Sequence, residues 1–204
     1  MNMANFDLDQ TIILENERVL LRPLEKTDFN ALLGFSLNEP EIWKYSLVQA
    51  GGEEKLKKYL DIAMEGRASK KEYPFIVFDK KQNSYAGSTR FYDIQLPHKT
   101  LQLGYTWYGK NFQGTGLNKH CKFLLLQYAF EIMQMERVEF RADNSNARSI
   151  AAMKAIGCTI EGVLRSSMYN GDGLTRRDSI VLSILKKEWF DSVKENLKKQ
   201  CETK

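Results

Sequence analysis

The spacing of apolar residues predicts several strands in the first half of the chain. Apolar and polar residues alternate from residue 101 to residue 108, which is the period of two that a strand requires. Shorter apolar runs upstream, separated by polar turns, predict further strands. The strands expected before Gly116 are residues 18–24, 75–78, 85–92 and 101–108. The last three follow one another closely, which predicts an antiparallel meander.

A helical period replaces the period of two after Gly116. Apolar residues at positions 117, 121, 124, 125, 128 and 132 fall on one face of a helix. Other helices are expected at residues 28–35, 53–67 and 150–156, the last of them ended by Gly157. A strand at 137–141 and a hairpin of strands at 159–169 and 176–185 complete the pattern.

The order of these elements predicts one domain over residues 1–204, because no linker, repeat or low-complexity tract interrupts it. The core is expected at about 18–186, followed by a C-terminal helix at about 187–200. The predicted fold class is α+β, with a mixed, mostly antiparallel central sheet of about seven strands flanked by helices.

The composition limits the classes of function. Basic residues outnumber acidic ones by only 30 to 26, and no basic stripe with interleaved aromatic residues stands out, so no nucleic-acid partner is expected. No apolar run approaches the roughly 20 residues that span a bilayer, and the first residues lack a secretory signal. Three scattered cysteines and two histidines predict neither a disulfide framework nor a metal site. We therefore expect a cytoplasmic protein without a membrane partner or a metal.

The turn Gly114-Thr115-Gly116 carries the clearest chemical signal. It follows a predicted strand and precedes a predicted helix, so several backbone N–H groups at the helix N-terminus lack partners. Together with the helix dipole, these groups suit a phosphate or pyrophosphate. The third glycine of a dinucleotide fingerprint is missing, and no Gly-Lys-Ser/Thr of a P-loop follows. A purely structural turn is the alternative interpretation.

A second polar cluster begins the next strand–helix unit. Asp143, Asn146 and Ser149 precede the helix-ending Gly157. Residues of these types at a helix start often only cap the helix. The functional alternative is that their side chains reach the arm or the reacting end of a cofactor.

Six short motifs occur in order along most of the chain. They are Leu20-Leu21-Arg22-Pro23-Leu24, Leu103-Gly104-Tyr105-x-Trp107, Gln113 to Asn118, Asp143-x-x-Asn146-x-x-Ser149, Gly157, and Glu161-Gly162-Val163-Leu164-Arg165. In these motifs the chain resembles the GNAT superfamily of acetyl-CoA-dependent N-acetyltransferases, and within it the branch of ribosomal-protein N-terminal acetyltransferases. The resemblance implies a GNAT-like fold and acetyl-CoA as co-substrate.

The resemblance also implies where CoA binds. The pyrophosphate loop falls on Asn111 to Gly116, with Asn111 in place of the usual arginine or glutamine. Backbone N–H groups from about Phe112 to Leu117 are expected to hold the pyrophosphate, and the backbone near Trp107 and the side chain of Asn146 to contact the pantetheine arm. The positions implied to bind the cofactor are Trp107, Asn111, Phe112, Gln113, Gly114, Thr115, Gly116, Leu117, Asn118, Lys119, Asn146 and Ser149.

Acetyl transfer to an amine needs a base, a stabilised oxyanion and an acid that protonates the CoA thiolate. The resemblance implies Glu139 as the base, and the alternative for this residue is a charge pairing with a neighbouring arginine. Met153 stands where many family members have a proton-donating tyrosine. Ser149 or Tyr169 is therefore expected to supply the proton, directly or through water. Gln102 replaces an acidic residue, which removes one alternative base.

These features predict an N-acetyltransferase that moves an acetyl group from acetyl-CoA to a primary amine by direct attack through a tetrahedral intermediate. The acceptor is either a protein N-terminus or a small-molecule amine, and a homodimer is an open alternative to a monomer. Trp43 and Tyr45 either shape the acceptor pocket or belong to the core. The missing tyrosine leaves a second interpretation, a non-catalytic acyl-CoA-binding or regulatory module. A nucleotide-binding protein that uses the same turn is a third.

Overall fold

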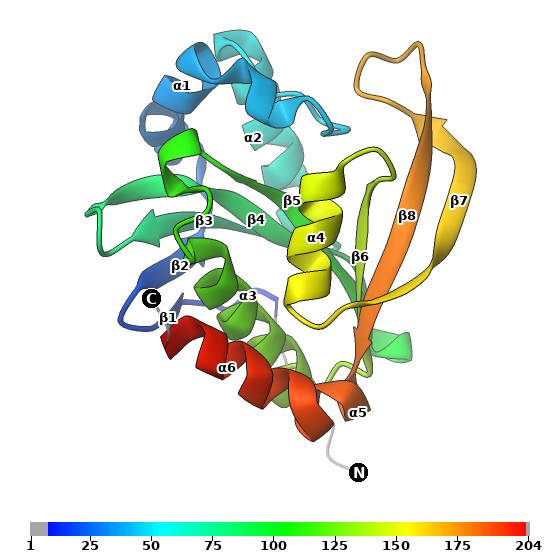
Figure 1. Ribbon diagram of the computed structural model, residues 1–204. Helices are drawn as coiled ribbons and strands as arrows, with labels where there is room; N and C mark the ends of the chain where they lie inside the picture. Colours follow the sequence, from blue (N-terminus) through cyan, green and yellow to red (C-terminus); the bar gives the residue numbers. More distant parts are fainter. Residues whose placement is uncertain (1–7, 203–204) are drawn as a thin grey trace.

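The computed structural model describes residues 8–202 and places eight strands in one sheet (Figure 1). Their order across the sheet is β1-β2-β3-β4-β5-β6-β8-β7. The strands are β1 (Leu14–Glu15), β2 (Val19–Pro23), β3 (Tyr73–Asp79), β4 (Ser84–Gln95), β5 (Thr100–Tyr108), β6 (Arg137–Asp143), β7 (Thr159–Tyr169) and β8 (Arg176–Leu185). The helices are α1 (Phe29–Asn38), α2 (Glu53–Ala68), α3 (Leu117–Gln127), α4 (Ala147–Ala155), α5 (Lys186–Glu188) and α6 (Lys194–Glu202).

The predicted α+β class and mixed sheet are confirmed. β5 and β6 run parallel, and all other neighbouring strands of the described sheet are antiparallel. The sheet has eight strands because it includes β1, whose two residues are too few to show a period in the sequence. The C-terminal helix begins at Lys186 as α5, continues through a π-helical turn at Trp189–Val193 and ends as α6.

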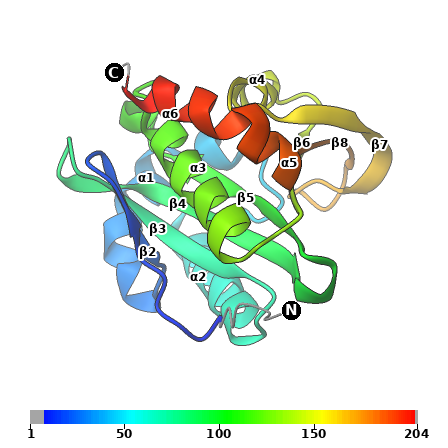
Figure 2. The same ribbon diagram turned by 90° about the horizontal axis from the view of Figure 1, so that it is seen from below.

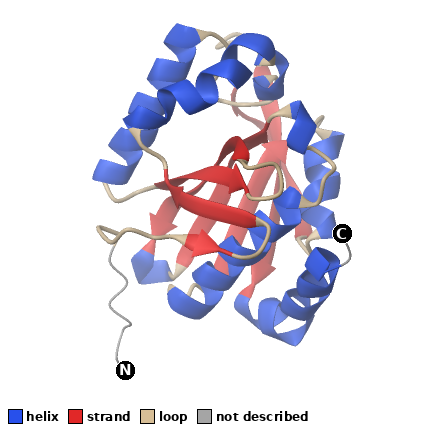
Figure 3. Cartoon of the chain, turned by 90° about the vertical axis from the view of Figure 1, so that its left-hand side faces the viewer, coloured by secondary structure: helices blue, strands red, loops and turns tan. Residues whose placement is uncertain are grey.

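Helices cover both faces of the sheet, as Figures 2 and 3 show. β3 is buried on both sides because its alternate residues enter two different cores. Phe75 and Val77 pack into the core that α3 and α6 complete, whereas Ile76 packs into the core that α1 and α2 complete. Trp43 lies in this second core, and its ring centroid is 4.7 Å from that of Trp107. Trp43 is therefore a core residue.

A β-bulge in β5 reverses the faces to which its side chains point. Between its register pairs with Ser88 and Arg90 of β4, β5 contains one residue more than β4 does. Tyr105 lies in this stretch and has a φ of 48°. Leu103 packs beneath α3, but Trp107 packs against the core of α2. The prediction of an unbroken alternation to residue 108 is therefore wrong, because an inserted residue interrupts a period of two.

β5 and β6 separate soon after they meet. Their parallel register is confined to three pairs, which join residues 100–102 of β5 to residues 137–139 of β6. Beyond Gln102, β5 pairs only with β4, while β6 stays paired with β8 as far as Asp143. Figure 1 shows the two strands diverging, with α4 beside the gap between them. We call the gap between residues 103–108 of β5 and β6 the splay.

Candidate active site

The turn at Gly114–Gly116 presents backbone donors that the described part of the chain does not use. Gly114 and Gly116 have φ values of 74° and 87°, in the left-handed region that favours glycine, and Gly116 is the N-cap of α3. The N–H groups of Gly114, Thr115, Gly116 and Asn118 donate to no acceptor among residues 8–202. They are placed at the N-terminus of an 11-residue helix, which is a favourable position for an anion.

The first residues of the predicted pyrophosphate loop use their N–H groups internally. Phe112 N–H donates to the carbonyl of Gly109 at 3.0 Å, and Gln113 N–H donates to that of Lys110 at 3.1 Å. The Phe112 ring is buried, and its centroid is 6.2 Å from that of Phe35. The donors that are free to face an anion thus begin at Gly114, later than the predicted start at about Phe112.

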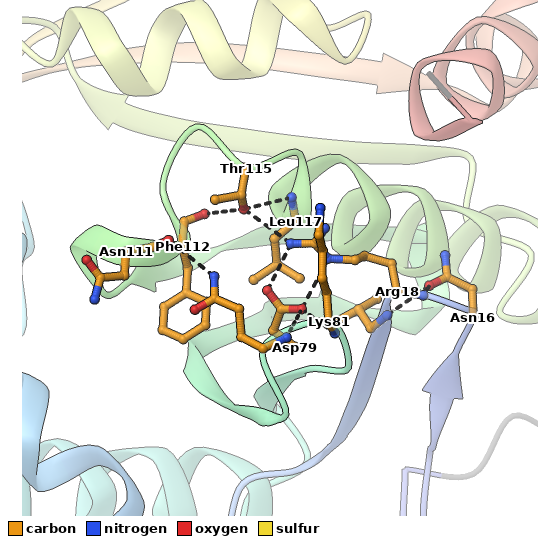
Figure 4. Close-up of polar contacts among 10 residues, drawn as sticks. Asn16, Arg18, Asp79, Lys81, Asn111, Phe112, Thr115 and Leu117 are labelled. Carbon is orange, nitrogen blue, oxygen red and sulfur yellow. Dashed lines mark hydrogen bonds and ion pairs between the residues drawn. The ribbon is translucent and has the colours of Figure 1, made fainter. Parts of the chain in front are cut away.

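A buried ion pair braces this turn from the sheet (Figure 4). Arg18 donates from Nε to Asp79 Oδ1 at 3.1 Å and from Nη2 to Oδ2 at 2.9 Å, and their side chains are 8% and 0% exposed. The same Nη2 is 3.5 Å from Thr115 Oγ1, which donates to the carbonyl of Phe112 at 2.8 Å. Gln82 Nε2 donates to the carbonyl of Asn111 at 3.3 Å. The end of β3 and the turn after it therefore support the loop.

Gln113 links the loop to α4. Its Nε2 donates to the carbonyl of Tyr108 at 2.8 Å, and its Oε1 accepts a hydrogen bond from Arg148. Arg148 is exposed, so this contact places a cation beside the unpaired donors of the turn. Lys119 lies half-buried in the first turn of α3, within electrostatic reach of Cys201 in α6, and its contact with the cofactor stays a prediction.

Trp107 stands on the strand that borders the splay. Its side chain is 5% exposed, and Nε1 donates to Tyr59 Oη at 3.3 Å. The residue is in register with Ser88 of β4 and has no partner in β6. The backbone of this stretch is thus unpaired on its β6 side, where the contact with a pantetheine arm is predicted.

The second polar cluster caps α4. Asn146 is the N-cap residue, and its Oδ1 accepts a hydrogen bond from the backbone N–H of Ser149 at 3.1 Å. Asp143 Oδ1 accepts from the N–H of Ser145 at 2.8 Å. Asn146 Nδ2 donates to none of the described residues. The capping interpretation therefore describes Asn146 here, and a contact with a cofactor through Nδ2 stays a prediction.

Glu139 is held between two arginines. Its Oε1 accepts from Arg141 Nε at 2.7 Å, and its Oε2 accepts from Arg137 Nη2 at 2.8 Å. Its side chain is 16% exposed and lies on the face opposite the buried Val138 and Phe140. The predicted charge pairing is thus present. Two hydrogen bonds leave further acceptor positions on a carboxylate, so the role of base remains a prediction.

The predicted proton donors differ in their surroundings. Met153 is buried in the core that α3 completes. Ser149 is half-buried in the first turn of α4, and Tyr169 is 57% exposed at the end of β7. No contact places either hydroxyl at the splay, so their role as acid also stays a prediction.

One titratable residue near the splay was not anticipated from the sequence. Lys122 of α3 is 5% exposed, and its Nζ donates to Thr106 Oγ1 at 2.8 Å. Burial lowers the pKa of this lysine to about 8. The only signal in the sequence is a lysine next to Cys121, in a helix whose apolar positions predict a buried face.

Residues 8–202 contain neither a metal-binding cluster nor a membrane-spanning helix. No group of three or more histidine, cysteine, aspartate or glutamate side chains there is arranged to hold a metal ion. In the same range, no helix has the length and apolar character needed to cross a bilayer.

Comparisons with known proteins define an acyltransferase enzyme. Residues 18–159 match the family described as "Acetyltransferase (GNAT) domain", and the chain belongs to this family. It is 25% identical over 181 residues to p20 of Bacillus licheniformis, named as an uncharacterized N-acetyltransferase, and the match covers 86% of this chain and 97% of p20. It is 32% identical over 107 residues to YdaF of Bacillus subtilis strain 168, named provisionally as a ribosomal N-acetyltransferase; the match covers 52% of this chain and 56% of YdaF.

A solved structure supports the same assignment. A protein of T. thermophilus, described provisionally as an acetyltransferase, superimposes with a TM-score of 0.82 at 33% identity. The superposition covers 92% of this chain and 96% of that protein. The predicted GNAT-like fold is confirmed.

Proposed function

We propose that the protein transfers an acetyl group from acetyl-CoA to a primary amine. One observation carries this proposal. The edge of β5 that faces β6 is unpaired along the splay, and the turn that follows β5 presents unused N–H donors at Gly114–Gly116. A diphosphate suits the turn, and a linear arm with amide groups suits an unpaired strand edge. Acetyl-CoA carries both parts.

The proposed reaction is direct transfer without an acyl-enzyme. Glu139 accepts a proton from the acceptor amine, whose nitrogen attacks the thioester carbonyl to give a tetrahedral intermediate. Backbone N–H groups of β5 along the splay stabilise the oxyanion. Collapse of the intermediate breaks the carbon–sulfur bond and leaves an amide and CoA. Asn146, through its unused Nδ2, helps to hold the pantetheine arm.

The acceptor belongs to one of two classes, a protein N-terminus or a small-molecule amine. The name of YdaF supports the first class, because that relative is assigned provisionally to ribosomal N-acetylation. Free cysteines at positions 121, 158 and 201 fit a reducing cytoplasm, where we place the reaction.

Ligand binding is the first test. Calorimetry with acetyl-CoA, CoA, ATP and NAD measures which ligand the turn accepts, and acetyl-CoA and CoA are expected to bind in the micromolar range while ATP and NAD bind much more weakly. Preferential binding of ATP or NAD would contradict the proposal and favour the nucleotide-binding interpretation.

Turnover is the second test. CoA release is followed with a thiol reagent in the presence of peptides with free N-termini and of small amines. Glu139→Gln is expected to lower kcat by about a hundredfold or more. Glu161→Gln is the matched control, because Glu161 also pairs with Arg137 but lies on exposed β7, and it is expected to change kcat only slightly. Tight acetyl-CoA binding without CoA release for any acceptor would favour the non-catalytic module.

A further inference from the structure

Lys122 is a buried cation that has no counter-charge in the described part of the chain. Its side chain is 5% exposed, and no described aspartate or glutamate forms an ion pair with it. Instead, Nζ donates to the hydroxyl of Thr106 at 2.8 Å and lies 3.4 Å from that of Thr89. Burying an ammonium group without an anion is unfavourable for folding. A lysine at this position therefore calls for an explanation other than stability.

The ammonium group lies between the two diverging strands. Thr106 belongs to the part of β5 that has no partner in β6, next to the bulge at Tyr105. On the other side, Nζ is 5.9 Å from the ring centroid of Phe140 in β6. Lys122 thus bridges the splay from the α3 side of the sheet.

Among residues 8–202, no group that is ionised at neutral pH faces Lys122. The groups that face it are the hydroxyls of Thr89 on β4 and Thr106 on β5, the ring of Phe140 on β6, and the thiols of Cys121 on its own helix and Cys158 after α4. Burial raises the pKa of both thiols to about 12, so both stay neutral. An ammonium group has three N–H donors, and the two hydroxyls accept at most two of them.

We propose that Lys122 is the proton donor to the departing CoA sulfur, an inference that rests on the proposed function. The bond between the amine nitrogen and the acetyl carbon forms, and the carbon–sulfur bond breaks. The sulfur takes the bonding electron pair and a proton from Nζ, which leaves Lys122 neutral and CoA as a thiol. The proton that the amine loses reaches solvent through Glu139, and solvent reprotonates Lys122. The net change is amine plus thioester to amide plus thiol.

The acidity of Lys122 fits this role. An ordinary lysine holds its proton too tightly to be an efficient acid near neutrality. Burial brings the pKa of Lys122 down to about 8, so the group is mostly protonated at pH 7 and yet releases its proton more readily. The role also accounts for Met153, since a tyrosine on α4 is not needed if α3 supplies the proton.

The first test does not depend on turnover. The pKa of the CoA thiol is measured in the bound state by the ultraviolet absorbance of the thiolate. In the wild type, the nearby ammonium group is expected to lower this pKa by about one unit relative to free CoA. Lys122→Met is expected to abolish the shift and Lys122→Arg to preserve it. The protein's own thiols do not interfere, because burial raises the pKa of Cys201 to about 11 and those of Cys121 and Cys158 to about 12.

The second test measures the rate of acetyl transfer with two leaving groups, the thiolate and the selenolate of CoA. With acetyl-CoA and an acceptor amine, Lys122→Met is expected to lower kcat about a hundredfold, to leave the KM for acetyl-CoA unchanged, and to remove the fall in rate above about pH 8. The acetyl selenoester of CoA is expected to restore most of the lost rate, since a selenolate leaves without protonation. Lys198→Met on the exposed side of α6 is the control and is expected to behave as the wild type.

The outcomes separate the two proposals. An unshifted thiol pKa in wild-type complexes, or the same shift in Lys122→Met, would overturn the role of Lys122 whatever the acceptor. An equal loss of rate with the thioester and the selenoester would overturn it as well. A wild type that shifts the thiol pKa but acetylates no amine would contradict the proposed function and still support an acidic Lys122 beside the sulfur.

Discussion

Arg18, which directly precedes β2, and Asp79, the last residue of β3, form a bidentate ion pair, and Arg18 also contacts Thr115 in the turn of the candidate active site. Asp79 Oδ1 additionally accepts from the backbone N–H of Lys81 at 2.9 Å. The two buried side chains therefore connect the strand ends of the sheet to the loop that presents the unused N–H donors.

Replacing one member of this pair is expected to be severe. Asp79→Asn leaves the Arg18 guanidinium buried without its anion, so the free energy of unfolding is expected to fall by about 3–5 kcal/mol. Urea unfolding at pH 7 measures the change. Glu15→Gln, which removes the exposed partner of Lys80, is the control and should cost less than about 1 kcal/mol. Equal effects of the two variants would contradict the role given to the buried pair.

A substitution in the turn separates backbone strain from ligand binding. Gly114 and Gly173 both have positive φ values, 74° and 69°, and a Cβ at either position meets no atom within 4 Å. Alanine at either site is therefore expected to cost a similar amount, about 1–2 kcal/mol of unfolding free energy. Gly114→Ala alone is expected to weaken CoA binding, by roughly tenfold, because a side chain there obstructs close approach to the backbone. Calorimetry with CoA compares the two variants, and equal affinities would count against the turn as the pyrophosphate site.

Removing the buried charge of Lys122 is expected to stabilise the fold. Its pKa is about 8 in the folded protein and about 10.5 when unfolded, so the unfolded chain binds more protons between these values and stability rises with pH across that window. Lys122→Met removes this penalty, and at pH 7 its unfolding free energy should exceed the wild-type value by about 1–3 kcal/mol. The hydroxyls of Thr89 and Thr106, 2.7 Å apart, satisfy each other in the variant. The difference in unfolding free energy between Lys122→Met and the wild type should shrink between pH 8 and pH 10. A difference that stays constant with pH would mean that better packing, and not the loss of the charge, stabilises the variant.

Acidification is expected to destabilise the protein through His120. Burial lowers the pKa of this histidine below its usual value of 6.5, and its Nδ1 is 3.1 Å from Asn16 Nδ2. The unfolded state therefore binds the proton first, so the contribution of neutral His120 is complete above about pH 6.5 and is lost as the pH falls toward the folded pKa. His120→Gln should flatten the stability curve in this window, and His98→Gln, in the exposed 3-10 helix Leu96–His98, is the control. Urea midpoints between pH 5 and pH 8 measure both.

The elements with a long, regular period were predicted well from the sequence. α3 was located by its apolar face after Gly116, and the β7–β8 hairpin by the turn at 170–173. Both signals are local, because side-chain spacing and turn residues reflect short-range geometry. β1 has no such local signal, because two residues show no period and the strand is defined only by its pairing with β2 in the folded sheet.

The bulge and the splay were not predictable in this way. Tyr105 adopts a positive φ without being a glycine or asparagine, so no residue type marks the inserted position. The position of Lys122 at the splay depends on how β5, β6 and α3 meet, and a single lysine in a helix does not reveal that. The turn at Gly114 can be recognised in the sequence because its residues are unusual. Lys122, the proposed acid, cannot be recognised in this way because lysine is common in helices.

The three register pairs between β5 and β6 make the sheet two leaves joined by a short seam. One leaf contains β1 to β5, and the other contains β6, β8 and β7. A molecule that lies in the splay touches β5 and β6, and so both leaves, at once and therefore resists their movement apart. Amide hydrogen exchange should then slow in β8 as well as in β5 when CoA binds, although β8 lies one strand beyond the seam. The splay that gives a ligand room to bind thus also allows the bound ligand to hold the two parts of the sheet together.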